Sequence, residues 1–186
     1  MSLAFLSCVR TAWLARPRRV LWSLAAFSWG LLGFGLYLQH GLGLEPCPMC
    51  IMQRYLWLLF GLVSWLGGWG VRDSTGLRAS RRWPLWLVSV VLCGVSLGGA
   101  YVAARQSWLQ WHPPAFASCG RDFYGIVETF PLHQALPLIF RGSGDCSAID
   151  WTFLGGTIAN WSFVCFVGVT WVVLAMLRAQ RRLRAI

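Results

Sequence analysis

The chain has 186 residues, of which 57% are hydrophobic and only 12% are charged. This composition is too apolar for the surface of an ordinary soluble domain and favours a membrane protein. The formal net charge is +10, and all sixteen basic residues are arginines. Such a charge would suit nucleic-acid binding, but the arginines lie in short tracts between apolar runs, as the charges that flank membrane spans do. We therefore expect no nucleic-acid partner.

Four apolar runs are long enough to cross a membrane, at about residues 20–38, 51–71, 84–104 and 157–177. A helix of about 20 residues spans the hydrocarbon layer, because each residue adds about 1.5 Å to its length. The first run follows a basic segment, as in a signal peptide, but it is longer than the usual apolar core of one and further spans follow. The sequence thus predicts an all-α fold, a polytopic four-helix bundle in a single integral-membrane domain covering residues 1–186.

The distribution of arginines predicts the orientation of the bundle, since positive charges gather on the cytoplasmic side of a membrane. The N-terminal tail, the turn 72–82 and the C-terminal tail carry four arginines each. The opposite side carries four in all, and five acidic residues offset them. Both termini are therefore predicted to be cytoplasmic, with two outer loops at about 39–50 and 105–156.

Four of the seven cysteines are predicted on the outer side, where disulfides persist: Cys47, Cys50, Cys119 and Cys146. A zinc site with four thiolates is disfavoured, because Cys119 and Cys146 are too far apart to form a second knuckle. Two static disulfides are a stronger alternative, since closing the 119–146 loop would stabilise the fold by roughly 3–4 kcal/mol. So short a ring at Cys47 and Cys50 would stabilise little. A relay of two exchangeable disulfides uses all four positions, and we favour it.

The Cys47-Pro48-Met49-Cys50 pair lies at the start of the second predicted span. The partial positive charge of a helix N-terminus favours thiolate over thiol in such a pair. Arg54 lies one turn after Cys50 on the same helix face and carries a permanent charge. An arginine at a helix end can simply reach toward the lipid head groups. Its spacing from Cys50 favours a functional role instead.

Several motifs resemble the disulfide bond formation protein B (DsbB) family in their order and spacing. They are Gln39-His40, Glu45-Pro46-Cys47-Pro48-Met49-Cys50 with Arg54, Ala104-Arg105-Gln106-Ser107-Trp108-Leu109-Gln110, Phe116-Ala117-Ser118-Cys119, Gly142-Ser143-Gly144-Asp145-Cys146 and Trp151-Thr152-Phe153-Leu154-Gly155. The resemblance covers nearly all of the chain outside the two tails.

This resemblance implies a bacterial inner-membrane enzyme, a thiol:quinone oxidoreductase with its active loops in the periplasm. It would reoxidise a periplasmic, thioredoxin-like DsbA-type protein and pass the electrons to ubiquinone or menaquinone, not covalently bound at rest. Cys47 and Cys50 would be the pair near the quinone, with Cys50 and Arg54 contacting it. Cys119 and Cys146 would exchange with the partner, and Cys119 would form the mixed disulfide.

Physical chemistry is consistent with this expectation. Thiol–disulfide exchange needs a thiolate that attacks an accessible sulfur, so we expect Cys119 and Cys146 to lie accessible in a flexible outer loop. A DsbA-type oxidant is a poor electron donor, with a potential of about −120 mV, so the final acceptor must be more oxidising than a glutathione pool. The alternative from another class is a membrane scaffold with two static disulfides that binds an envelope partner. Redox titration separates the two, because static disulfides resist reductants in the glutathione range.

Overall fold

The computed structural model describes residues 13–14, 16–71, 85–113 and 146–184. Within them lie four long helices and one short β-ribbon: α2 (Pro17–Gly41), α3 (Pro48–Gly70), α4 (Leu85–Trp111), β1 (Thr152–Phe153), β2 (Gly156–Thr157) and α7 (Ile158–Arg184). Each helix has the length and composition needed to cross a membrane. The predicted all-α four-helix membrane fold is confirmed.

Every helix extends past at least one end of the apolar run that predicted it. The clearest case is α4, which was expected to end at about residue 104 and continues to Trp111. The added turns carry Gln106 and Gln110, polar side chains that a hydropathy argument leaves out of a span. A helix does not have to end where the hydrocarbon ends, because its backbone hydrogen bonds are made within the segment.

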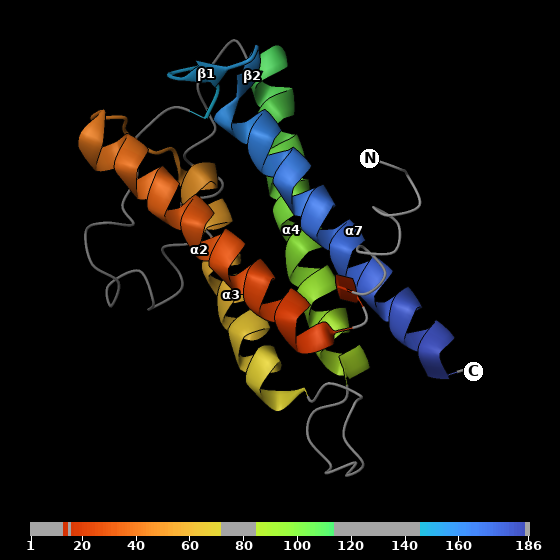
Figure 1. Cartoon of the computed structure of the whole chain (residues 1–186). Coiled ribbons are helices and arrows are strands. Elements are labelled where there is room, and N and C mark those ends of the chain that lie inside the picture. The colour runs from red at the N-terminus through yellow and green to blue at the C-terminus, as the bar shows by residue number, and fades with distance from the viewer. Residues whose placement is uncertain (1–12, 15, 72–84, 114–145, 185–186) are drawn as a thin grey trace, which may run out of the picture.

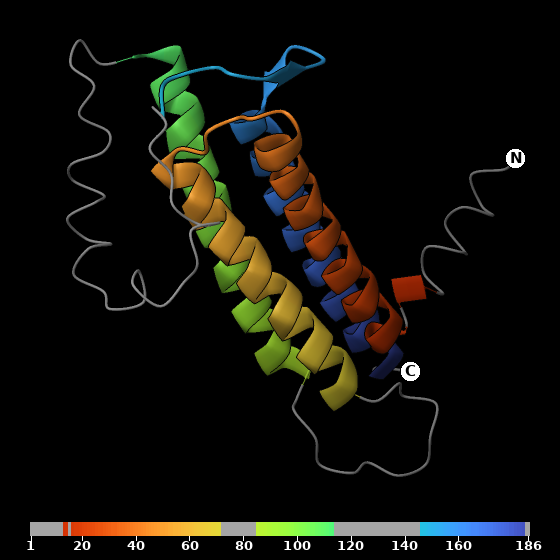
Figure 2. The same cartoon turned by 90° about the vertical axis from the view of Figure 1, so that its left-hand side faces the viewer.

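The four helices run alternately up and down (Figure 1). The end of α2, the start of α3, the end of α4 and the start of α7 therefore meet at one end of the bundle, which we call the cysteine end. The start of α2 and the end of α7 lie at the opposite end (Figures 1 and 2). This arrangement brings segments that are distant in sequence to one end.

Consecutive helices pack along their lengths, whereas α2 and α7 touch over a short stretch. The central contact is a stack of Trp57 from α3 on Phe166 from α7, with ring centroids 4.0 Å apart. Gly99 of α4 makes room for it, because a methyl group there would lie 2.3 Å from the Phe166 ring. The stack ties α3 to α7 in the buried core of the bundle.

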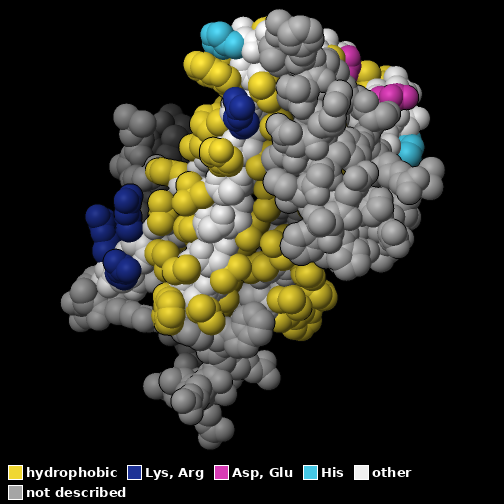
Figure 3. All heavy atoms as spheres, turned by 180° about the vertical axis from the view of Figure 1, so that it is seen from behind, with side chains coloured by type: hydrophobic (Ala, Val, Ile, Leu, Met, Phe, Trp, Pro, Cys, Tyr) yellow, Lys and Arg dark blue, Asp and Glu magenta, His cyan; other side chains and the backbone are white. Residues whose placement is uncertain are grey.

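Large apolar side chains cover the outside of the bundle as well as its core. Trp86, Tyr101 and Val90 are 61%, 72% and 58% exposed, and Figure 3 shows hydrophobic side chains along the outward helix faces. Surfaces of this kind are stable against lipid and unstable against water. The chain is therefore a multi-pass membrane protein.

The β-ribbon lies at the cysteine end, just before α7. Its two strands pair antiparallel, with Phe153 opposite Gly156. The two residues between them, Leu154 and Gly155, have φ values of 49° and 77°. Positive φ at both positions is typical of the tight hairpin turns that match the twist of paired strands. The Trp161 indole of α7 donates to the Phe153 carbonyl at 2.9 Å and fixes the ribbon on the helix.

Candidate redox site

The cysteine pair forms the first turn of α3. Cys47 is the N-cap residue, with an extended backbone, and its sulfur accepts a hydrogen bond from the backbone N–H of Cys50 at 3.4 Å. Pro48 follows at the first helical position, where its missing N–H costs nothing. The Pro-x-Cys sequence thus starts the helix at the pair, so that both sulfurs lie at the positive end of the helix dipole.

Both residues are free thiols in this structure. Cys47 Sγ donates a hydrogen bond to Cys50 Sγ at 3.2 Å. Cys47 is 4% exposed, whereas Cys50 is half-buried. The hydrogen bond gives the two sulfurs different roles: Cys47 keeps the proton, and negative charge is favoured on Cys50.

Cys146 lies against this pair. Its side chain is 1% exposed and packs with Cys47 and Met49 in a small cluster at the cysteine end. Hydrogen bonds with Cys146 and with Cys50, together with burial, raise the pKa of the Cys47 thiol far above its usual value. The structure therefore brings three of the four predicted cysteines together.

The burial of Cys146 corrects the expectation that it would lie exposed in a flexible loop. Two hydrogen bonds hold the segment that follows it against α4. Gln110 Nε2 donates to the carbonyl of Ala148 at 3.3 Å, and Thr157 Oγ1 donates to Gln110 Oε1 at 2.7 Å. Cys119 and the turn 72–82 lie outside the described residues, so the predicted pairing of Cys119 with Cys146 stays a prediction.

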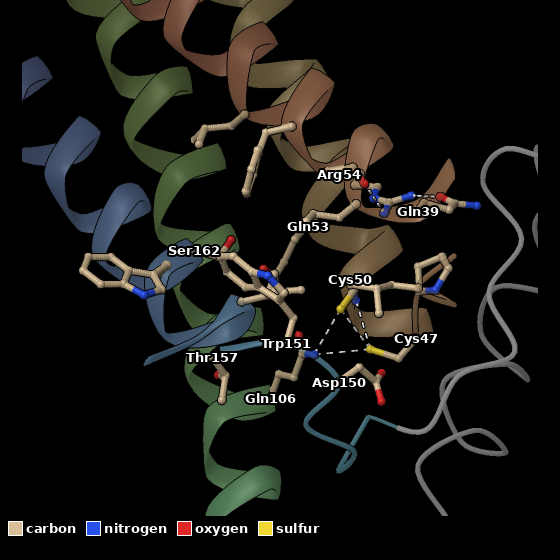
Figure 4. A pocket seen from close by; sticks show the side chains of 18 of the residues that line it. Gln39, Cys47, Cys50, Gln53, Arg54, Gln106, Asp150, Trp151, Thr157 and Ser162 are labelled. Carbon is tan, nitrogen blue, oxygen red and sulfur yellow. Dashed lines mark hydrogen bonds between the residues drawn. The ribbon is translucent and has the colours of Figure 1, made fainter. Parts of the chain in front are cut away.

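Two buried glutamines, Gln53 and Gln106, lie beside the cysteine turn (Figure 4), and the sequence alone indicated no role for them. Gln106 of α4 donates through Nε2 to both sulfurs, at 3.3 Å to Cys47 and 3.1 Å to Cys50. Its Oε1 accepts a 2.7 Å hydrogen bond from Nε2 of Gln53 on α3. The sequence offered one sign of this pair, because a glutamine on an otherwise apolar helix face is expected to be buried and buried polar groups need partners.

Arg54 lies one turn below Cys50, as its spacing predicted. Its guanidinium donates to the side-chain oxygen of Gln39 and, at 3.1 Å, to the carbonyl of Gly35, both on α2. Figure 4 shows the side chain directed toward Gln39. These hydrogen bonds anchor the cation between α2 and α3, and a direct role toward a bound molecule stays a prediction.

A pocket of about 180 Å³ opens between the four helices at the cysteine end. Cys50, Arg54 and Gln106 line it, and so do the rings of Trp57 and Trp161. The pocket thus combines aromatic walls with cysteine thiols and one permanent cation. These residues fit a flat redox molecule with an apolar body and polar oxygens.

The other described cysteines, Cys93 and Cys165, are half-buried in α4 and α7, and both pack against the main hydrophobic core. Cys165 also lines the pocket. Within the described ranges, no group of three or more His, Cys, Asp or Glu side chains is arranged to hold a metal ion.

Comparison with known proteins identifies a family that the chain matches. A profile described as "Disulfide bond formation protein DsbB" matches residues 17–176. The chain is 57% identical over 175 residues to disulfide bond formation protein B of Paracidovorax citrulli (strain AAC00-1), covering 92% of this chain and 94% of that protein. It is 46% identical over 164 residues to the protein of the same name from Aromatoleum aromaticum (strain DSM 19018 / LMG 30748 / EbN1), covering 88% and 94%.

Proposed function

The chain belongs to the disulfide bond formation protein DsbB family, and we propose on that basis that it is a thiol:quinone oxidoreductase of the bacterial inner membrane. It would oxidise the dithiol of a periplasmic, thioredoxin-like DsbA-type protein and pass two electrons and two protons to a membrane quinone. The observation that carries this proposal is the contact of Cys146 with the Cys47–Cys50 turn beside a pocket.

The contact supports a transfer of electrons between two cysteine pairs. In the oxidised protein, a thiolate of the partner would attack Cys119, forming a mixed disulfide and releasing Cys146 as the leaving group. Cys146 is next to Cys47, so it can attack that sulfur in a Cys47–Cys50 disulfide and release Cys50 as a thiolate. The partner's second thiol and Cys119 complete the exchange in turn, which leaves Cys47 and Cys50 reduced.

Once Cys47 and Cys50 are both reduced, three groups favour negative charge on the Cys50 sulfur. Cys47 donates its thiol proton toward it, Gln106 donates an N–H, and the N-terminus of α3 supplies partial positive charge. Hydrogen bonds that involve a charged group are stronger than neutral ones. Cys50 would therefore be the sulfur that donates electrons to the acceptor.

The pocket supplies a place for the acceptor. Cys50, Arg54 and the aromatic side chains of the pocket would hold a quinone, which when bound accepts the two electrons and two protons. Arg54 would stabilise negative charge on a reduced oxygen, because its own charge is permanent and its hydrogen bonds to α2 fix its place. The chain's own part is therefore to orient the acceptor beside Cys50 and to balance its charge.

The orientation in the membrane is part of the proposal. The described arginines at the start of α2 and in the last turns of α7 lie at the end opposite the cysteines. By the positive-inside rule that end would face the cytoplasm, and the cysteine end would face the periplasm. An oxidising compartment is where a disulfide relay can operate.

Quinone absorbance tests the proposal directly. Protein reconstituted with ubiquinone or menaquinone and supplied with reduced DsbA-type partner should convert the quinone to quinol, with one disulfide formed in the partner for each quinol. A membrane scaffold with static disulfides would oxidise no partner and leave the quinone spectrum unchanged.

A further inference from the structure

Gln53 and Gln106 form a hydrogen-bonded pair that ends on the two sulfurs of the cysteine turn. Both are almost fully buried, at 4% and 3% exposed. They come from different helices, so the pair also bridges α3 and α4 next to the site. Buried amides inside a membrane bundle are costly unless they are paired. Here the two amides pair with each other, and the Gln106 amide also donates to the two sulfurs.

The direction of the pair follows from the chemistry of an amide. A glutamine side chain has an oxygen that only accepts and an NH₂ that only donates. Gln53 donates to Oε1 of Gln106, so Oε1 faces α3 and the NH₂ group of Gln106 faces the sulfurs. The donor from Gln53 therefore sets which end of the second amide meets Cys47 and Cys50.

We propose that Gln106 is a positioning residue that stabilises the thiolate form of Cys50, and that Gln53 acts through Gln106 by fixing the orientation of its amide. This inference rests on the proposed thiol:quinone chemistry for the function of the thiolate. The contacts that support it are those of the reduced cysteine turn alone. Gln106 would favour the charged form of the electron-donating sulfur without carrying a charge or exchanging a proton itself.

Two features separate this role from simple packing. Gln106 Nε2 is 3.1 Å from Cys50 Sγ, and a donor to a charged sulfur stabilises the charged form more than the neutral one. Removing it should therefore move the ionisation of Cys50, which a filler of similar volume would not do. Replacing Gln53 should change the ionisation of Cys50 only while Gln106 is present.

The test measures alkylation of Cys50 by iodoacetamide as a function of pH, in the reduced full-length protein, with mass spectrometry of the peptide that carries Cys50. Gln106→Met keeps the volume and removes both N–H donors. We expect it to raise the pH midpoint of Cys50 alkylation by about one to two pH units. Gln106→Asn has a side chain one methylene shorter, which moves the N–H donors away from the sulfurs, and it should also raise the pH midpoint of Cys50 alkylation. This second variant keeps the test decisive if the Met variant does not fold.

A double-mutant cycle tests the part assigned to Gln53. Gln53→Met should raise the midpoint by less than Gln106→Met does, and should add no further shift in the Gln106→Met background. Ser107→Ala is the matched control, because Ser107 is buried on the same helix and its hydroxyl has no hydrogen-bond partner in the described part of the chain. Its midpoint should equal that of the wild type.

An unchanged midpoint in Gln106→Met and Gln106→Asn would overturn the role of Gln106. Additive shifts of Gln53→Met and Gln106→Met would overturn the role of Gln53. Neither result depends on a quinone or a partner, so wild-type protein that alkylates as expected but reduces no quinone would refute the proposed function and leave this inference standing. If the proposed function and the role of Gln106 are both correct, quinone reduction by Gln106→Met should fall about tenfold or more at neutral pH and recover as the pH is raised.

Discussion

Cys146 hydrogen-bonds to Cys47, although Cys146 lies in the long segment between α4 and α7 and Cys47 caps the start of α3. A contact between sulfurs from separate segments is what electron transfer between two cysteine pairs needs, because thiol–disulfide exchange proceeds by direct attack of one sulfur on another. Oxidation of a Cys50→Ser, Cys119→Ser variant should therefore join Cys47 to Cys146 in high yield.

Mass spectrometry of the unreduced peptides would detect this cross-link. The matched control is Cys47→Ser, Cys119→Ser, which leaves Cys50 to meet Cys146 and should cross-link more slowly, since Cys146 packs mainly with Cys47 and Met49. Equal rates in the two variants would mean that Cys146 does not distinguish between the two sulfurs.

Arg54→Met should weaken the quinone-dependent step. The substitution keeps a similar length of apolar side chain and removes the cation that lines the pocket with Cys50. We expect the quinone concentration at half-maximal rate to rise, by about tenfold if a charge-assisted contact of about 1.4 kcal/mol is lost. The affinity for the protein partner should not change. Turnover equal to the wild type at limiting quinone would reduce Arg54 to an anchor between α2 and α3.

Stability of the reduced protein should fall at alkaline pH because of Cys47. Its folded-state pKa is raised, so above the ordinary cysteine pKa of about 8.5 the unfolded chain loses this proton while the folded chain keeps it. The stabilisation is complete below that pH and declines as the pH rises above it. Thermal unfolding followed by circular dichroism between pH 7 and 10 should show the decline, and Cys47→Ala should flatten it. Parallel curves for the two proteins would contradict the assignment.

Gln110 should control the exposure of Cys146. Gln110→Leu removes the hydrogen bonds to Ala148 and Thr157 that hold the segment after Cys146 on α4. We expect alkylation of reduced Cys146 by a bulky maleimide to become several-fold faster, as burial of the sulfur is lost. Thr157→Val removes one of the two bonds and should give a smaller increase. No change in either variant would show that other contacts bury Cys146.

The sequence was sufficient to predict the helices and insufficient to predict the contacts at the site. Apolar runs of about 20 residues are a strong local signal, and the pair at Cys47 and Cys50 was correctly expected in the first turn of its helix. The burial of Cys146 and the donation from Gln106 depend on how α3, α4 and the segment before α7 meet in space. No local pattern encodes such meetings, which is why Cys146 was expected to be exposed and Gln106 received no role.

The most direct test of the two-pair relay compares two electron donors in the same quinone assay. Changing Cys119 and Cys146 together to Ser should abolish oxidation of the DsbA-type partner and leave quinone reduction by dithiothreitol measurable, because a small dithiol can reach the Cys47–Cys50 turn and a folded protein cannot. Changing Cys50 to Ser should abolish both, since it breaks the cysteine pair that lines the pocket. If the Cys119 and Cys146 double variant loses both donors equally, the two-stage relay is wrong and the four cysteines act as a single centre.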